Sequence, residues 1–467
     1  MEADLTPPSG EGYRRLSLWW DGLPGRIGIR APIPGDIDAD VAVVGGGLTG
    51  LWTAFYLAEA DPTLRIAVLE RDVVGFGASG RNGGWCSALF AVSEERLNHL
   101  VGKGAGAAMR HAMEGTIREV GRVVGSEGID CGFTPGGTVV LARTAAQLQR
   151  TRDEMAAARA LGITEDDLVM LSATEAAAMV GATDVLGGTY TPHCAAVDPA
   201  RLVRGLADTV ERRGVTIYEQ TEVRTIGSGA VETARGRVTA PIVVRATEGY
   251  TRTLRGEGRT LIPVYSLMIA TEPLPDGFWA EAGLARRETF ADHRHMVIYG
   301  QRTEDGRIAF GGRGAPYHFG SAIRPEFDRD ESVHEDLRRT LVELFPALAD
   351  ARVTHRWGGP LGVARDWFSS VGIDRVTGVA WAGGYVGDGV STTNLAGRTL
   401  SDLILRQDTE LTGLPWVGHR SKPWEPEPLR YLGINAGLRL AGSADRAENR
   451  AGRATWHARA LERLVGG

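Results

Sequence analysis

A glycine-rich turn between a strand and a helix is the feature that most constrains this fold. Residues 40–50 read DVAVVGGGLTG, in which four apolar residues predict a buried strand, and the pattern over 51–60 predicts a helix. Between them, Gly45, Gly47 and Gly50 have G-x-G-x-x-G spacing. Such glycines allow a tight turn, close approach of the backbone to a pyrophosphate and close packing of helix on strand. The helix N-terminus would direct its free N–H groups and dipole at the phosphates, so the turn predicts a dinucleotide site.

An acidic residue follows at the distance that such a site requires. The segment 65–69 predicts a second strand, which ends at Glu70, twenty residues beyond Gly50. A carboxylate there accepts hydrogen bonds from ribose hydroxyls of NAD or FAD, and its charge disfavours the 2′-phosphate of NADP. Glu70 could also be a surface residue at a strand end, but its spacing favours the ribose role. These residues alone leave NAD and FAD open.

Length and composition exclude several classes of protein. The chain has 467 residues, 43% hydrophobic and 24% charged, which is ordinary for a globular protein of about two domains. A net charge of −6 gives no reason to expect nucleic acid or an anionic membrane as a partner. Cys86, Cys131 and Cys194 are too few and too scattered for a disulfide framework or a zinc site, so no metal is expected. No apolar run approaches the roughly 18 residues of a membrane span, which predicts a soluble, cytoplasmic protein.

Periodicity divides the rest of the chain into helices and strands. Residues 13–23, within a proline-bearing leader, predict a short amphipathic helix that docks on the body. Helical patterns occupy 93–124, 145–161, 198–213, 335–345 and 391–405, and strand patterns occupy 216–218, 222–226, 242–246 and 379–389. Between 265 and 312 the apolar period changes towards two, which predicts an antiparallel sheet inserted into an α/β chain.

A second glycine cluster follows the strand that bears Glu70. Residues 75–84 read GFGASGRNGG, and so many glycines would lose too much entropy in a packed strand or helix. The run suits a loop whose backbone touches a ligand, with Ser79, Arg81 and Asn82 as polar contacts. Composition alone fits a mobile surface loop equally well.

This second cluster resembles a known family, the flavin-dependent amine oxidases of the D-amino-acid oxidase group. That group includes glycine oxidase, sarcosine oxidase and γ-glutamylputrescine oxidase, and the run G-A-S-G-R-N-G-G looks most like the last branch. The resemblance extends from residue 19 to residue 405. It implies a Rossmann-like FAD-binding domain with an interleaved antiparallel-sheet substrate domain, the glutathione-reductase type of FAD fold.

The implied domains are discontinuous. The FAD-binding domain would comprise 40–90, 185–260 and 350–410, and the substrate domain would comprise 91–184 and 261–349. A leader (1–39) that packs on the body and a C-terminal extension (411–467) would flank them.

The resemblance and the glycine motif together imply which residues contact FAD. The second cluster would cross between the pyrophosphate and the flavin ring, and the closing run WAGGYVGDG (381–389) would approach the ring's pyrimidine end. A helix N-terminus near 391–393 would stabilise the anionic reduced flavin. The residues assigned to FAD are Gly45, Gly47, Leu48, Thr49, Gly50, Glu70, Arg71, Ala78, Ser79, Gly80, Arg81, Asn82, Gly83, Gly84, Val223, Gly384, Gly387, Asp388, Gly389, Val390, Ser391 and Thr392.

The implied reaction is oxidation of a C–N bond in a small amine or amino-acid-like substrate. Hydride passes to flavin N5, and the resulting imine is hydrolysed by water. Oxygen or another electron acceptor would then reoxidise the flavin. The candidate residues around the substrate are Arg313, His295, Tyr299 and Asp388, where Asp388 could hold a cationic amine by charge.

Four positions depart from the sarcosine oxidase pattern. Ala309 stands where those relatives have a lysine that aids oxygen reduction, so either another residue such as Arg313 activates oxygen or the reaction with oxygen is slow. Ser87 and Ser391 fall near the places of their carboxylate binders, which favours an amine without a carboxylate. Gly359 replaces their flavin-attaching cysteine, which predicts non-covalent FAD.

Two other functions remain open from the sequence. An NAD-dependent dehydrogenase would explain the first glycine motif but would leave the clusters at 75–84 and 383–389 without a role. A flavin-binding subunit without independent turnover would explain all three, and the missing lysine and carboxylate binders are compatible with it.

Overall fold

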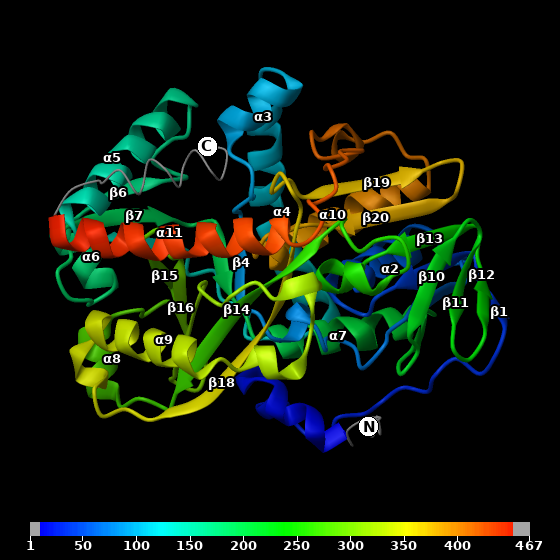
Figure 1. Cartoon of the computed structure of the whole chain (residues 1–467), viewed down its shortest axis with the longest axis horizontal. Coiled ribbons are helices and arrows are strands. Elements are labelled where there is room, and N and C mark those ends of the chain that lie inside the picture. Colours follow the sequence, from blue (N-terminus) through cyan, green and yellow to red (C-terminus); the bar gives the residue numbers. More distant parts are fainter. Residues whose placement is uncertain (1–9, 452–467) are drawn as a thin grey trace.

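The structure, a computed structural model, describes residues 10–451. A six-stranded sheet occupies the right half of the molecule in Figure 1. In spatial order its strands are β19 (Ser370–Asp374), β20 (Val379–Gly383), β13 (Ile242–Arg245), β2 (Val41–Val44), β3 (Ile66–Leu69) and β9 (Thr216–Tyr218). All neighbours are parallel except β19 and β20. Strands far apart in the sequence thus build one Rossmann-like sheet.

Both faces of this sheet are covered, which explains the unbroken apolar run of β2. Val41 and Val43 pack against the helices of one face, whereas Ala42 and Val44 belong to a separate cluster on the other face. That second face is covered by a four-stranded sheet, β1 (Ile37–Asp38), β12 (Arg237–Thr239), β11 (Ala230–Thr233) and β10 (Val223–Gly227). A strand that is buried on both faces has no polar side to alternate with.

An eight-stranded sheet forms the other half. Its order is β18 (Val353–Val363), β14 (Ile262–Thr271), β17 (Ile308–Gly312), β16 (Ile298–Arg302), β15 (Thr289–Asp292), β5 (Thr138–Ala142), β7 (Gly187–Thr191) and β6 (Val169–Ser172). A two-stranded sheet, β4 (Trp85–Ser87) and β8 (Cys194–Ala196), completes the strands of the described residues.

The eight-stranded sheet differs from the expected substrate domain in two respects. It is mixed and not wholly antiparallel, because β15 and β5 run parallel. Its strands β7 and β18 also lie within 185–260 and 350–410, segments that the sequence had assigned to the FAD-binding domain. The long pairing of β14 with β18, from Ile262 opposite Val363 to Thr271 opposite Val353, carries β18 from one half of the molecule into the other.

Eleven α-helices surround the sheets within residues 10–451. They are α1 (Leu18–Asp21), α2 (Leu48–Ala60), α3 (Glu94–Val101), α4 (Ala105–Glu127), α5 (Ala145–Ala160), α6 (Ala173–Met179), α7 (Pro199–Arg212), α8 (Asp276–Ala282), α9 (Glu331–Leu344), α10 (Gly389–Ile404) and α11 (Leu429–Ala451). In this part of the chain, none of the helices combines the length and apolarity that crossing a membrane requires.

The single helix expected at 93–124 is two helices. Gly102 and Gly104 separate α3 from α4, and their φ angles of +130° and +92° lie in the region that favours glycine. Between Val101 and Met109 the sequence reads GKGAGAA, so the apolar spacing is interrupted there, and the prediction of one helix passed over these glycines.

The two ends of the described chain pack on different parts of the molecule. The leader forms a 3-10 helix, η1 (Gly10–Leu16), and α1, and it buries Tyr13, Trp19 and Trp20 against the body. At the other end α11 crosses the molecule, in red in Figure 1.

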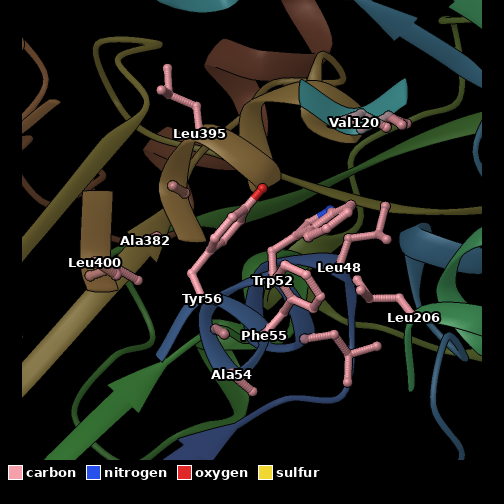
Figure 2. Close-up of a cluster of buried hydrophobic side chains, with 14 of the residues drawn as sticks. Leu48, Trp52, Ala54, Phe55, Tyr56, Val120, Leu206, Ala382, Leu395 and Leu400 are labelled. Carbon is pink, nitrogen blue, oxygen red and sulfur yellow. The ribbon is translucent and has the colours of Figure 1, made fainter. Parts of the chain in front are cut away.

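The core of the six-stranded half depends on a close crossing of α10 over α2. Figure 2 shows Trp52, Phe55 and Tyr56 of α2 beside Leu395 and Leu400 of α10. At the crossing, a Cβ on Gly397 would lie 2.7 Å from Cβ of Trp52. The helices can approach this closely only because α10 has no side chain there.

We therefore expect Gly397→Ala to destabilise the protein by about 1–3 kcal/mol, because the added methyl group overpacks a rigid helix crossing. Denaturant unfolding of the mutant measures this loss. The matched control is Gly125→Ala in α4, where a Cβ would meet no atom within 4 Å. That change should be neutral or stabilising by up to about 1 kcal/mol. Equal effects at the two positions would contradict the packing argument.

Candidate functional site

The first cavity lies where the parallel strands β2, β3 and β13 end. Its walls combine the first glycine turn, the ends of β3 and β10, the second glycine cluster and the start of α10. Of the residues assigned to FAD from the sequence, it is lined by Gly45, Gly47, Leu48, Thr49, Glu70, Arg71, Ala78, Ser79, Asn82, Val223, Gly387, Gly389 and Val390. We call this space the cofactor groove.

The glycine turn leaves no room for side chains. Gly45 has φ +111°, and a Cβ there would lie 2.5 Å from the carbonyl oxygen of Ala246. A Cβ on Gly50 would collide with the carbonyl oxygen of Gly45 and lie 2.9 Å from Cγ1 of Val43. These contacts place the N-terminus of α2 directly at the groove, where its N–H groups and dipole favour an anion.

Glu70 lies at the groove, next to the glycine turn. Its carboxylate accepts hydrogen bonds from the backbone N–H of Gly46 (2.8 Å) and of Asp72 (2.9 Å). Burial raises the pKa of Glu70 to about 7, although both N–H donors favour the charged form. A carboxylate has about four acceptor positions, so two remain for ribose hydroxyls.

A second acid of the groove escaped the sequence analysis. Glu248 follows β13, and its carboxylate accepts hydrogen bonds from the N–H groups of Gly384 (2.8 Å) and Tyr385 (3.2 Å). Its φ of +41° is unusual for a residue with a side chain. Burial raises the pKa of Glu248 to about 7. Glu248 thereby ties the end of β13 to the closing glycine motif.

A second cavity of about 470 Å³ adjoins the groove, and we call it the substrate cavity. The two spaces share Ala78, Asn82, Leu361, Gly387 and Val390 as lining residues. The substrate cavity also reaches the eight-stranded sheet, α4 and the segment around Asp167. A ligand in it would therefore meet the part of a cofactor that lies beside the second glycine cluster and the start of α10.

Three of the four catalytic candidates line the substrate cavity: Arg313, Tyr299 and Asp388. Burial raises the pKa of Asp388 to about 6, and the nearby Arg313 cation opposes that rise. Arg313 donates a hydrogen bond to the carbonyl oxygen of Val386 (2.5 Å) and lies over the ring of Trp367. The hydroxyl of Tyr299 shares a 2.8 Å hydrogen bond with Ser266.

The fourth candidate, His295, lies elsewhere. In the described structure it lines neither cavity, and its Nε2 pairs with Glu448 of α11 at 3.1 Å. His293, two residues earlier, does line the cavity; burial lowers its pKa to about 4, so it is neutral at pH 7. The two histidines stand two residues apart, and only the fold distinguishes them.

Several residues assigned to FAD support the cavities without facing the groove. Arg81 is buried beside the substrate cavity, where it forms an ion pair with Asp328 (2.7 Å) and donates to the hydroxyl of Tyr250 (3.1 Å). Gly83 and Asp388 likewise line only the substrate cavity. The residues that line neither cavity are Gly50, Gly80, Gly84, Gly384, Ser391 and Thr392.

A polar group in the substrate cavity was also missed. His193 pairs with Asp167 at 3.0 Å, and Glu114 accepts a 3.1 Å hydrogen bond from Arg110. Ligand atoms of His193, Asp167 and Glu114 lie within 4.8 Å of one another. The residues come from three segments of the chain with no shared motif, so spacing in the sequence gave no signal.

The cysteines are all free and buried, and in the described structure none of Cys86, Cys131 and Cys194 lines either cavity. Gly359 lines the substrate cavity and packs beside Arg81.

The site combines a glycine turn at the end of a parallel strand, an acid at the end of the next strand and an adjoining cavity. This combination defines a dinucleotide-dependent enzyme. Comparison with known proteins specifies the dinucleotide. The family model described as "FAD dependent oxidoreductase" (DAO) matches residues 40–403. The chain belongs to this family of FAD-dependent oxidoreductases, and the NAD-dependent alternative is set aside.

The individual relatives agree. The chain is 30% identical to γ-glutamylputrescine oxidoreductase of Escherichia coli over 80% of this chain and 85% of the relative. It is 29% identical to the probable oxidoreductase OrdL of Rhizobium meliloti over 86% of this chain and 91% of the relative. The solved structure of glycine oxidase from Geobacillus kaustophilus shares the fold, with a TM-score of 0.68 at 22% identity over 82% of this chain and 99% of that chain.

The groove fits FAD on its own observations. A Cβ on Gly45 would obstruct the turn, and the carboxylate of Glu70 keeps free acceptor positions beside it. Val223 stands at the edge of β10, where it could contact the adenine, and Thr49 and Leu48 open the helix that would face the pyrophosphate. The substrate cavity adjoins this groove at the second glycine cluster and the start of α10.

FAD affinity should depend on pH through Glu70. Ribose hydroxyls donate to the ionised carboxylate, so FAD lowers the Glu70 pKa from about 7 and binding releases a proton. The dissociation constant of FAD should therefore fall roughly tenfold from pH 6 to pH 8. Fluorescence titration of the apoprotein measures it. Glu70→Gln should flatten this slope; an unchanged slope in that mutant would assign the proton to Glu248 or another group.

Proposed function

We propose that this chain oxidises a small amine with non-covalently bound FAD and passes the electrons to oxygen or another acceptor. The observation that carries the proposal is the substrate cavity, which shares five lining residues with the cofactor groove and places Asp388, Arg313 and Tyr299 in its wall. Relatives named for glycine, sarcosine and γ-glutamylputrescine support an amine or amino-acid-like substrate.

The charges of the cavity favour a cationic substrate. Of its lining arginines, Arg81 pairs with Asp328, and Arg110 pairs with Glu94 and Glu114. Ser391, near a carboxylate-binding place of sarcosine oxidases, donates its hydroxyl to the carbonyl oxygen of Ser87. The third lining arginine, Arg313, lies near Asp388. The acids Glu114, Glu154, Asp167 and Asp388 outnumber the three arginines of the lining. An amine without a carboxylate suits this lining, and the polar group around His193 suits a second polar group at the far end of the substrate.

Each residue then has a limited task. FAD, when bound, supplies the acceptor for the hydride that leaves the carbon next to nitrogen. The carboxylate of Asp388 attracts the ammonium group and can take its proton, because a pKa of about 6 is close to neutral pH. Tyr299 and Leu361 bound the cavity and limit water around the reacting bond. The nitrogen lone pair forms the C=N bond of an imine, which water hydrolyses outside this step.

We further propose that FAD is held without a covalent bond, in a reducing compartment such as the cytoplasm. Buried free cysteines that lie away from both cavities support both statements. Acid precipitation should leave the flavin in the supernatant.

The electron acceptor can be inferred from the place of the missing lysine. Ala309 is fully buried in β17 among Trp357, Met268 and Ala270, so no cation stands there. We propose that the reduced enzyme reacts slowly with oxygen and faster with an acceptor such as a quinone.

Anaerobic titration tests the reaction and stopped-flow mixing tests the acceptor. Alkylamines should bleach the flavin absorbance of the holoenzyme, and a quinone should restore it faster than air does. Failure of every amine in a broad panel would favour the alternative of a flavin-binding subunit without turnover. Rapid recovery in air would overturn the inference from Ala309 alone.

The second test is the pH dependence of flavin reduction. The Asp388 pKa lies above its ordinary value, so the charged form is lost as pH falls through about 6. We expect kcat/KM to fall below pH 6 in the native enzyme, and Asp388→Asn to lose that limb together with roughly tenfold or more of kcat/KM. A wild-type pH profile in Asp388→Asn would remove this acid from the mechanism.

Arg313→Ala should impair turnover with FAD still bound.

A further inference from the structure

The second glycine cluster is held from behind by an unusual set of hydrogen bonds. Its consecutive residues Gly80, Arg81 and Asn82 each present a carbonyl oxygen to a side chain outside the loop. Ser17 donates to Gly80 (3.4 Å), Trp357 donates to Arg81 (2.8 Å) and Trp19 donates to Asn82 (2.8 Å). Ser17 and Trp19 belong to the leader, and Trp357 belongs to β18.

The leader is itself firmly attached to both halves of the molecule. Trp20 is fully buried and packs against the cluster, because a Cβ on Gly80 would lie 2.7 Å from its Nε1. Tyr13 stacks at an angle on Trp20, and the ring of Trp19 meets the ring of Trp357 edge to face. Towards the eight-stranded half, Asp21 pairs with His355 of β18 at 3.2 Å.

This attachment determines how the loop faces the cavities. The carbonyl groups of 80–82 are satisfied by the leader and β18. Other groups of the same loop line the two cavities: residues 75–79 and Asn82 line the cofactor groove, and Ala78 and residues 81–83 line the substrate cavity. The Asn82 amide fixes the loop further by donating to the carbonyls of Ala78 and Ser79, both at 3.1 Å. A loop rich in glycine would otherwise lose much entropy on adopting one conformation.

We propose that the leader is a positioning element of the flavin site, and that Trp19 acts through the carbonyl of Asn82 to hold the loop 75–84 in its FAD-binding conformation. The inference rests on the proposed FAD site. The leader lies outside residues 40–403, the part of the chain that the family model covers. Trp19 is a positioning residue, since it acts on the cofactor through the loop.

The test compares two tryptophan variants of the full-length chain. Trp19→Phe keeps an aromatic ring but removes the indole N–H that donates to Asn82. Trp416→Phe is the control, because Trp416 is fully buried, lines neither cavity in the described structure, and its Nε1 has no hydrogen-bond partner among residues 10–451. The measurements are the dissociation constant of FAD, the absorption spectrum of the bound flavin and the melting temperature of the apoprotein.

We expect Trp19→Phe to raise the FAD dissociation constant about three- to tenfold, the range for one lost hydrogen bond, and to shift the bound-flavin spectrum. Trp416→Phe should lower the melting temperature and leave both flavin readouts unchanged. Trp19→Phe with wild-type FAD affinity and spectrum would overturn the inference and make the leader a stabilising element only.

If Trp19→Phe does not fold, Ser17→Ala removes the weaker hydrogen bond to Gly80 and is tested with the same measurements. We expect a smaller shift in the same direction. The absence of any shift would overturn the inference. Failure of the proposed function is separate, since it would appear as wild-type protein that binds no FAD or is reduced by no amine.

Discussion

Close packing of α2 on the end of β2 is the constraint on which the rest of the structure depends. Because Gly45 and Gly50 bring helix and strand together without side chains, the N-terminus of α2 stands at the edge of the sheet. The remaining walls of the groove are then placed by their own contacts with this edge. Glu70 reaches it through the N–H of Gly46, and Ser79 reaches it by accepting a hydrogen bond from the N–H of Leu48 at 2.9 Å.

Three half-buried carboxylates surround the space that this edge creates. Burial raises the pKa of Glu70 and of Glu248 to about 7 and that of Asp388 to about 6. Each therefore loses its charge at a higher pH than a surface acid does. Each also lies at a different part of the site: the first glycine turn, the closing glycine motif and the substrate cavity. A bound ligand that donates hydrogen bonds or brings positive charge stabilises the charged form of these acids, and so offsets the desolvation cost that they carry in the free protein.

The sequence predicted those parts of the site that a short segment specifies by itself. The first glycine turn and Glu70 were recognisable because strand, turn, helix and acid follow one another within about thirty residues. Arg81 was expected at FAD, yet its partner Asp328 is 247 residues away, and only the fold reveals the ion pair. Glu248 joins the end of β13 to the closing glycine motif, more than 130 residues further along the chain. His295 pairs with Glu448 of α11, whereas His293 lines the substrate cavity, and only the fold separates the two. The break at Gly102 was different: the glycines of 102–106 mark it in the sequence, and it was missed because helical patterns lie on both sides.

The order of the strands has a consequence for how the chain folds during its synthesis. In the six-stranded sheet, β20 pairs with β13, although 133 residues separate the end of β13 at Arg245 from the start of β20 at Val379. During synthesis β2, β3, β9 and β13 can therefore associate long before β20 and α10 leave the ribosome, with one sheet edge and one face of α2 uncovered. The nascent chain would pass through a long interval in which it resembles a folded domain but lacks part of its core. The yield of folded protein would then depend more on how well that edge is protected, by a chaperone or by slow early folding, than on the stability of the finished fold.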